Sequence, residues 1–315
     1  AETIPYTREW IDKLKQSILL EEDELELLDK EYTVYLAQMI NSFIHRFKIK
    51  NIDTICSHGH TVFHKPNVGI TRQIGNLPLL AKKTNRLTIC DFRVQDVKFN
   101  GQGAPLVPIG DKHLFYNYGY CLNLGGFANI SFDIDNVRIA FDICPVNIVL
   151  NHYVNQLNVE YDDEGNLAKT GKVQDELLNA LNSLDFYNQN HPKSLGLEWV
   201  KSIIFPLIES YDLSIEDILR TFVEHISIQI SNIINKKSHA SVLATGGGVY
   251  NLFLIELIKQ KSKNEIVIPS KQIIEFKEAL IFGFLGVLKL REEVNCLSSV
   301  TGALKDHSSG NIFYP

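Results

Sequence analysis

Residues 122–129 have the sequence Leu-Asn-Leu-Gly-Gly-Phe-Ala-Asn, which places paired glycines between two strand-like segments. Residues 242–248, Val-Leu-Ala-Thr-Gly-Gly-Gly, place three glycines between a strand and a helix. Glycine lets a phosphate or nucleobase approach the backbone without meeting a Cβ, and a following helix N-terminus adds N–H donors. Each run is also compatible with an ordinary tight turn. A nucleotide site and plain turns therefore both remain open from these residues alone.

Two familiar phosphate-binding motifs are excluded. The segment from Gly165 to Lys172 has one residue too many for a P-loop, and Val173 stands where Ser or Thr is required. Residues 246–251 lack the last glycine of the dinucleotide fingerprint. A bound nucleotide would therefore use neither framework.

Strand-like and helical segments alternate around these glycine runs. Short strands are predicted at residues 52–57, 61–64, 71–74, 87–90, 121–124, 128–133, 137–142, 241–245 and 266–268. Helices are predicted at residues 7–20, 22–47, 76–84, 147–157, 215–234, 249–261 and 275–291, and residues 93–118 are predicted to form a long loop. This alternation indicates an α/β protein. The length of 315 residues favours two lobes, which we place at residues 1–132 and 133–315, the second mostly helical.

Composition limits the partners and the compartment. The 31 basic and 37 acidic residues give a net charge of −6, which supports neither a nucleic-acid nor a polyanion partner. The cysteines number five, an odd count, and several lie in apolar runs, which is typical of reduced thiols in the cytoplasm. The most apolar segment is too short to span a bilayer. We therefore expect a cytoplasmic protein without a membrane or nucleic-acid partner.

Two carboxylates stand at positions where they can be catalytic. Asp142 follows an apolar strand, where α/β enzymes often hold a general base, and partial burial would raise its pKa. It can equally cap the helix that follows. Glu278 lies in the first turn of the apolar helix predicted at residues 275–291, where a negative charge also suits the helix dipole.

Arg93 follows the strand predicted at residues 87–90. Its planar guanidinium can hold a carboxylate or a phosphate through paired hydrogen bonds. It can also form a structural ion pair with Asp91 or Asp96. The residues alone leave both interpretations open.

Three histidines, His58, His60 and His64, alternate along a predicted strand and would share one face. Three imidazoles on one face can bind zinc, which would indicate a metal-dependent hydrolase. They can also be the polar face of an ordinary strand. No companion His-x-Glu or Cys-x-x-Cys motif supports a metal, so no metal ligands are predicted.

Taken together, the chain resembles the 1,6-anhydro-N-acetylmuramic acid kinase family, which has the two-lobed actin-like (ribonuclease H-like) ATPase fold of sugar kinases and Hsp70. The resemblance runs from about Ile55 to the C-terminus and rests on many ordered matches. These are residues 57–64 (Ser-His-Gly-His-Thr-Val-Phe-His), 73–75 (Gln-Ile-Gly), 91–93 (Asp-Phe-Arg) with Asp96, 101–108 (Gly-Gln-Gly-Ala-Pro-Leu-Val-Pro), 123–129, 141–142 (Phe-Asp), 192–196 (Pro-Lys-Ser-Leu-Gly), 245–248, 278–280 (Glu-Ala-Leu) and 299–303 (Ser-Val-Thr-Gly-Ala).

The resemblance implies an ATP- and Mg²⁺-dependent reaction of peptidoglycan recycling. Water adds across the 1,6-anhydro bridge of the sugar, and O6 is phosphorylated to give N-acetylmuramic acid 6-phosphate. By the family pattern, Asp142 is the general base that activates the water, Glu278 positions sugar and water, and Arg93 binds the lactyl carboxylate. A homodimer is compatible with the family.

The resemblance also implies the remaining contacts. The other substrate-binding residues would be His58, Gln73, Asp96 and Asn147. The ATP-binding residues would be Gly125, Gly126 and Asn129 at the phosphates, and Gly246, Gly247, Gly248 and Asn251 at the adenosine.

The chain departs from the family pattern in several places. Residues 142–147 read Asp-Ile-Cys-Pro-Val-Asn where the family has Asp-Thr-Gly-Pro-Gly-Asn, so this loop is expected to approach the ligand less closely. His60 replaces a glutamine, and Asn76 replaces an aspartate. The family begins with a strand and a Gly-Thr-Ser-x-Asp-Gly phosphate loop, and nothing similar precedes Thr7. We therefore expect that loop upstream of Ala1, and a chain starting at Ala1 to be inactive; the alternative is a catalytically inactive sugar-binding relative.

Overall fold

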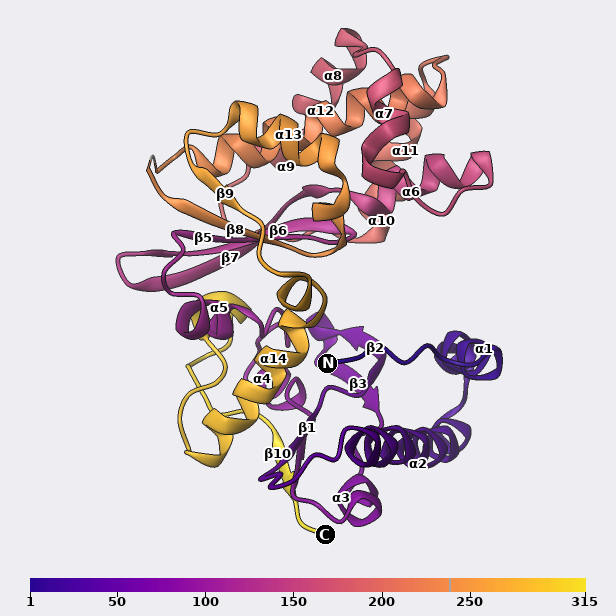
Figure 1. The fold of residues 1–315 in the computed structure, drawn as a ribbon, viewed down its shortest axis with the longest axis vertical. Coiled ribbons are helices and arrows are strands. Elements are labelled where there is room, and N and C mark those ends of the chain that lie inside the picture. Colours follow the sequence, from indigo (N-terminus) through magenta and orange to yellow (C-terminus); the bar gives the residue numbers. More distant parts are fainter. Residues whose placement is uncertain (238) are drawn as a thin grey trace. The chain divides into compact units, whose positions relative to one another are not determined.

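The computed structural model describes residues 1–237 and 239–315, and the chain forms two compact units (Figure 1). Unit 1 comprises residues 1–110 and 278–315, and unit 2 comprises residues 111–277. The α/β class expected from the sequence is confirmed. The division differs from the expected boundary between residues 132 and 133. That boundary would cut strand β6 (Phe127–Ile134), which pairs with a strand on each side.

Unit 2 is built on a five-stranded sheet with the order β7-β6-β5-β8-β9. Strands β5 (Tyr120–Leu124), β6 and β7 (Val137–Pro145) form an antiparallel meander. Strands β8 (Ser241–Thr245) and β9 (Glu265–Val267) run parallel to β5. Because β5 and β8 are parallel neighbours, the two glycine runs that follow them lie at the same edge of the sheet.

Helices make up most of the rest of unit 2, and Figure 1 shows α12 (Ile215–Ile234) and α13 (Leu252–Lys261) on one side of the sheet. The side chain of Ser214 caps α12 by accepting a hydrogen bond from the Asp217 N–H. The buried stripe of α12 includes Phe222 and Ile226, which lie in the core of the unit. The other helices are α6 (Asn147–Val154), α7 (Asn166–Thr170), α8 (Asp175–Asn182), α9 (Asp185–Asn188), α10 (Leu197–Trp199) and α11 (Phe205–Glu209), and α5 (Pro108–Leu114) crosses from unit 1 into unit 2.

Unit 1 contains a three-stranded sheet, β1 (Ile55–Ser57), β4 (Thr88–Cys90) and β10 (Asn311–Phe313), and a hairpin of β2 (His60–Lys65) and β3 (Ile70–Ile74). Its helices are α1 (Arg8–Gln16), α2 (Glu22–Arg46), α3 (Leu79–Thr84), α4 (Val94–Lys98) and α15 (Ser298–Thr301), together with the C-terminal part of α14 (Lys271–Leu290). Leu25, Leu28 and Tyr32 of α2 pack with Val62 and Ile74 of the hairpin. This packing fixes the hairpin that carries several predicted site residues.

The structure corrects two expectations about secondary structure and adds one strand, in the C-terminal tail, that the sequence did not predict. The predicted loop at residues 93–118 contains α4 and α5, which are too short to give a detectable helical period. The C-terminal tail contains β10, which pairs with β4 and so belongs to unit 1. Helix α14 begins at Lys271 rather than at residue 275, and Leu280 is 48% exposed, so this helix is not buried on all sides.

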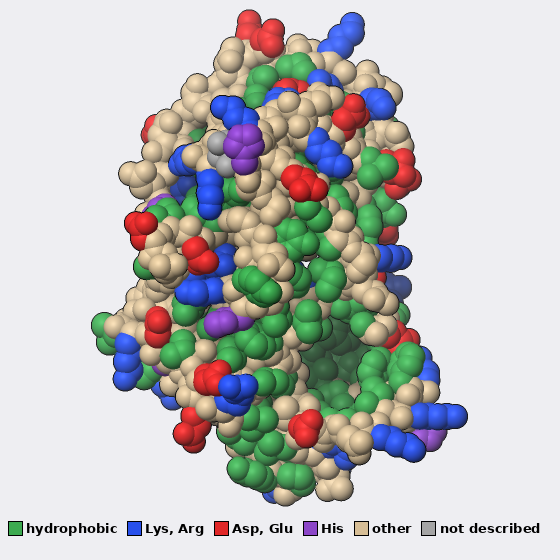
Figure 2. Space-filling view, turned by 60° about the vertical axis from the view of Figure 1, so that its left-hand side comes forward, with side chains coloured by type: hydrophobic (Ala, Val, Ile, Leu, Met, Phe, Trp, Pro, Cys, Tyr) green, Lys and Arg blue, Asp and Glu red, His purple; other side chains and the backbone are tan. Residues whose placement is uncertain are grey.

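The surface carries mixed charge. Figure 2 shows one face of the molecule, on which acidic and basic side chains are interspersed rather than gathered in a patch of one sign. None of the helices within the described ranges combines the length and hydropathy that crossing a bilayer requires.

Candidate active site

A row of polar side chains crosses the sheet of unit 2 beside the glycine runs. Thr245 of β8 pairs with Asn123 of β5, Asn123 pairs with Asn129 of β6, and Asn129 pairs with Asp142 of β7. Directly paired residues on neighbouring strands place their side chains on the same face of a sheet. Asn123 and Thr245 were not predicted as site residues, although each is the polar residue near the end of an apolar strand.

Asp142 lies inside β7, which continues to Pro145. The alternative that it caps the next helix is wrong, because Val146 occupies the N-cap position of α6. The N–H of Leu195 donates to Asp142 Oδ2 at 2.8 Å, and the Asp142 N–H donates to the Lys193 carbonyl at 3.1 Å. Burial raises the pKa of the Asp142 carboxyl, and the bond from Leu195 opposes this shift. A carboxylate with a raised pKa is a stronger general base.

The turn at Gly125 and Gly126 is tied to the start of α6. The N–H of Val146 donates to the Gly126 carbonyl at 2.8 Å, and the N–H of Asn147 donates to the Gly125 carbonyl at 3.3 Å. A Cβ on Gly125 would meet nothing nearer than 3.4 Å, and one on Gly126 nothing nearer than 3.9 Å. The turn therefore leaves space above its backbone, as a phosphate-binding loop requires.

The three glycines after β8 have different structural roles. Gly246 has φ +85°, and a Cβ there would lie 2.6 Å from the Leu124 carbonyl oxygen, while a Cβ on Gly248 would lie 2.8 Å from Leu124 Cβ. A Cβ on Gly247 would meet nothing within 4 Å. Gly246 and Gly248 are therefore needed for close packing on β5, and Gly247 borders open space.

Asn251 has a structural contact. Its Oδ1 accepts a hydrogen bond from the Leu254 N–H at 2.9 Å and so caps α13, and the residue is 8% exposed. The structure therefore gives Asn251 a capping role, and the adenosine contact that the resemblance implies for it stays a prediction.

In unit 1, Arg93 is held by His58 and by a backbone carbonyl. Arg93 Nε and Nη2 lie 3.1 and 2.9 Å from His58 Nε2, and Nη1 donates to the Gly103 carbonyl at 2.9 Å. A guanidinium only donates, so His58 Nε2 must be the acceptor, and the His58 Nδ1–H donates to the Gly59 carbonyl at 3.0 Å. Burial, followed by the charge of Arg93, lowers the pKa of His58. His58 is therefore neutral in this arrangement.

Gln73 completes this cluster from β3. Its Nε2 donates to the His58 carbonyl at 2.9 Å and lies 3.2 Å from the Thr61 hydroxyl. Its Oε1 is buried and has no hydrogen-bond partner among the described residues. A buried amide oxygen without a partner is a position where a ligand can supply the missing donor.

Glu278 is exposed and lies about two turns inside α14, so the helix-dipole explanation for its position does not apply. Phe282, one turn later on α14, packs its ring edge-on against His58 with centroids 4.8 Å apart. The negative charge of Glu278 raises the pKa of both His58 and Arg93, opposing the effect of burial. Glu278 therefore belongs electrostatically to the Arg93 cluster.

Asp96 is completely buried and binds protein groups. Its Oδ2 accepts from the Gly103 N–H at 2.7 Å, and its Oδ1 accepts from the Thr301 hydroxyl at 2.8 Å. Asp96 therefore positions the loop whose Gly103 carbonyl holds Arg93, in place of the substrate contact predicted from the sequence. The Asp91 carboxylate accepts a hydrogen bond from the side chain of Asn311. Arg93 bonds to His58 and to the Gly103 carbonyl and forms an ion pair with neither aspartate.

The three histidines of the alternative zinc site have separate contacts. His64 Nδ1 lies 3.2 Å from the Thr71 hydroxyl, and the His60 ring packs edge-on against Tyr32. Within the described ranges, the group of side chains close enough to share a metal is a different one, which contains none of these histidines. The structure thus offers no support for a metal-dependent hydrolase built on them.

The glycine run after β8 generates a stability prediction. Gly246→Ala forces a Cβ against the Leu124 carbonyl at a positive φ, so we expect it to lower the free energy of unfolding by about 1–3 kcal/mol. Gly247→Ala is the matched control, and its effect should stay within about 0.5 kcal/mol. Urea unfolding of both variants measures the difference, and equal losses would contradict the roles assigned here.

The neutral state of His58 generates a pH prediction. Because the folded-state pKa of His58 lies below 6.5, its ordinary value, the unfolded chain binds the proton more readily. The stabilisation that neutral His58 contributes is therefore complete above pH 6.5 and is lost as the pH falls below 6.5. The stability difference between the wild type and His58→Gln should shrink between pH 7.5 and pH 5 in urea unfolding. A difference that does not change with pH would show that His58 is not held neutral.

Comparison with known proteins places the chain in a family. The family profile described as anhydro-N-acetylmuramic acid kinase matches residues 2–315. Proteins of that name from Mannheimia succiniciproducens and Clostridioides difficile are each 32% identical to the chain, covering 91% and 98% of it and 82% and 88% of their own lengths. One from Hydrogenovibrio crunogenus is 31% identical, covering 100% of the chain and 90% of its own length.

Two solved structures are also similar. The activator of the 2-hydroxyisocaproyl-CoA dehydratase from Clostridium difficile with bound ADPNP aligns with 52% of this chain and 57% of its own, at 16% identity and a TM-score of 0.33. Component A of the (R)-2-hydroxyglutaryl-CoA dehydratase of Acidaminococcus fermentans aligns with 64% of this chain and 77% of its own, at 12% identity and a TM-score of 0.37. Both TM-scores are low. The sequence matches are decisive, and the chain belongs to the anhydro-N-acetylmuramic acid kinase family.

Proposed function

We propose that this protein opens the 1,6-anhydro bridge of 1,6-anhydro-N-acetylmuramic acid with water and phosphorylates O6 with ATP. The product is N-acetylmuramic acid 6-phosphate. Family membership supports the reaction, and the observation that carries it in this chain is the polar row ending in Asp142 beside two glycine turns at one sheet edge. Because the phosphoryl donor is ATP, we place the reaction in the cytoplasm.

Arg93 is suited to the lactyl carboxylate of the sugar. A guanidinium has five N–H donors, and His58 and Gly103 together use three of those of Arg93. The two that remain, one on each terminal nitrogen, form the fork that binds a carboxylate through paired hydrogen bonds. The unpaired Gln73 Oε1 accepts a hydrogen bond from a hydroxyl or an amide N–H of the same sugar.

The nucleotide binds along the glycine turns of unit 2. The open backbone at Gly125 and Gly126, with Asn129 beside it, accepts the phosphates, and Gly247 borders the adenosine. Mg²⁺ prefers oxygen ligands, and the amide oxygens of Asn123 and Asn129 are of that kind, with phosphates and water as its other ligands. When bound, the ion neutralises charge that develops on the transferred phosphoryl group.

Asp142 acts as the general base. Its carboxylate removes a proton from the water that attacks C1, the C1–O6 bond breaks, and O6 becomes the nucleophile toward the γ-phosphorus, with ADP as the leaving group. Burial supports this role because it raises the pKa of Asp142 toward the working pH. Glu278 positions the sugar and the attacking water, and Asn147 contacts the sugar from the start of α6.

The reaction itself is tested with the full-length protein, the anhydro sugar and ATP in ¹⁸O-water. We expect ADP and a 6-phosphosugar that carries the label on the C1 hydroxyl, as read by mass spectrometry. Sugar binding without turnover would instead identify an inactive sugar-binding relative. Asp142→Asn should lower kcat by about 100-fold or more with little change in KM. Asp135→Asn, in the exposed turn of the same hairpin, is the control and should keep wild-type kcat.

The role of Arg93 is tested by pairing a variant with a truncated substrate. Arg93→Lys cannot form the fork, so KM for the anhydro sugar should rise by about 10- to 100-fold while KM for ATP stays the same. A 1,6-anhydro sugar without the lactyl group should bind the wild type and the variant about equally. If the variant loses affinity for both sugars alike, Arg93 does not bind the lactyl carboxylate.

A further inference from the structure

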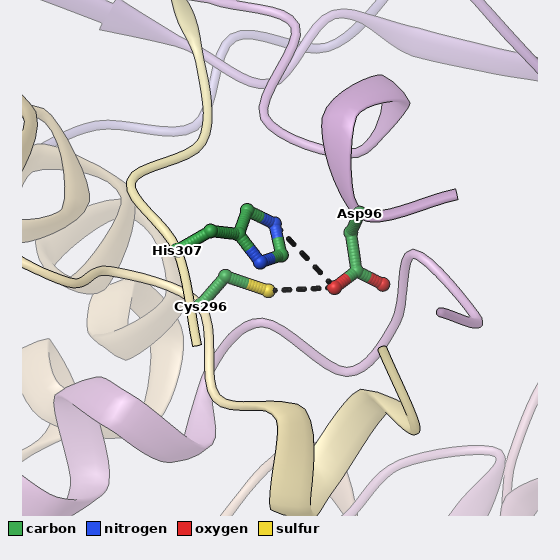
Figure 3. Close-up of side chains that lie close together, drawn as sticks. All are labelled: Asp96, Cys296 and His307. Carbon is green, nitrogen blue, oxygen red and sulfur yellow. Dashed lines mark hydrogen bonds and ion pairs between the residues drawn. The ribbon is translucent and has the colours of Figure 1, made fainter. Parts of the chain in front are cut away.

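Three buried side chains from distant parts of the sequence meet in unit 1. Asp96 lies in α4, Cys296 lies just before α15, and His307 lies in the C-terminal segment that follows α15. Cys296 and His307 are partners in an antiparallel bridge, with the Cys296 N–H donating to the His307 carbonyl at 3.0 Å. Figure 3 shows both side chains directed toward the Asp96 carboxylate.

The distances within this cluster suit a shared metal ion. Cys296 Sγ lies 3.0 Å and His307 Nε2 lies 3.6 Å from Asp96 Oδ1, and the three donor atoms all lie within 4.8 Å of one another. A tetrahedral zinc ion with ordinary bond lengths holds its sulfur, nitrogen and oxygen ligands about 3.3–3.7 Å apart. Small side-chain shifts are therefore enough to form the site.

The orientation of His307 is a second, independent observation. Its Nδ1 lies 3.0 Å from the Lys305 carbonyl, which can only accept a hydrogen bond, so Nδ1 carries a proton. Its Nε2 is buried and has no hydrogen-bond partner among the described residues, although it faces a carboxylate oxygen. Histidines that ligate metals usually donate their other N–H to a backbone carbonyl in this way.

We propose that Asp96, Cys296 and His307 bind a divalent transition metal ion, Zn²⁺ by the chemistry of its donors. A thiolate and an imidazole suit Zn²⁺ and do not suit the Mg²⁺ that accompanies ATP. Cys296 releases its thiol proton to solvent when the Zn–S bond forms. The three side chains are 0%, 1% and 6% exposed, so the site is enclosed.

The metal site connects to the candidate active site through one loop. Asp96 Oδ1 faces Cys296 and His307, whereas Asp96 Oδ2 accepts from the Gly103 N–H. The Gly103 carbonyl in turn accepts from Arg93 Nη1. A metal ion on Asp96 would therefore hold the C-terminal segment rigidly against the loop that orients Arg93.

The proposal is tested on purified protein without nucleotide. After the protein is loaded with Zn²⁺ and desalted in excess Mg²⁺, elemental analysis should find about one zinc ion per chain, and zinc should raise the thermal midpoint by several degrees. After Co²⁺ replaces zinc, a thiolate-to-cobalt charge-transfer band should appear together with the visible bands of a tetrahedral site. A wild-type protein that gives neither stoichiometric zinc nor the thiolate band overturns the proposal and leaves a buried hydrogen-bonded cluster.

Variants then locate the ion. Cys296→Ser should abolish the charge-transfer band, and His307→Asn should abolish stoichiometric zinc. Cys121→Ser is the matched control, because Cys121 is an equally buried thiol in unit 2, and it should keep the metal. Zinc retained by both Cys296→Ser and His307→Asn would also overturn the proposal. If a variant fails to fold, the cobalt spectrum of the wild type still decides the question.

Discussion

The parallel pairing of β5 with β8 determines the arrangement of the candidate nucleotide site. It joins Asn123 to Thr245, residues more than a hundred positions apart, and aligns the ends of both strands. The pairing is so close at the end of β5 that a side chain at Gly246 or Gly248 would collide with Leu124. Without that close approach, the two glycine turns would be separate loops. With it, they border one edge of the sheet, next to the polar row that ends at Asp142.

The Arg93 cluster of unit 1 depends on a chain of single hydrogen bonds rather than on a sheet. Asp96 holds Gly103, Gly103 and His58 hold Arg93, and Gln73 holds the backbone of His58. Within the described part of the chain, the contacts to His58 and Gly103 use three of the five N–H groups of Arg93, and the Oε1 of Gln73 has no hydrogen-bond partner. These remaining groups are the ones that the proposed function assigns to the carboxylate and to a donor of the sugar.

The sequence was informative where the signal is local. The glycine runs and the strands beside them depend on neighbouring residues, and the structure has them. The boundary between the units, β10 and the role of Asp96 depend on contacts between segments far apart in the chain, and no local period reports such contacts. Asn251 shows a further limit, because an asparagine after a glycine run has the same pattern whether it caps a helix or contacts a ligand.

The largest departure from the family pattern near Asp142 lies at residues 144 and 146. Cys144 and Val146 stand where the family has glycines, and a bulky side chain there was expected to keep a ligand away. Both side chains are completely buried in the core of unit 2, so they point away from solvent. The backbone at Val146 still donates to the Gly126 carbonyl, which ties this segment to the candidate phosphate turn. The side chains that replace the glycines therefore pack into the core of unit 2, and the backbone of this segment remains hydrogen-bonded to the Gly125–Gly126 turn.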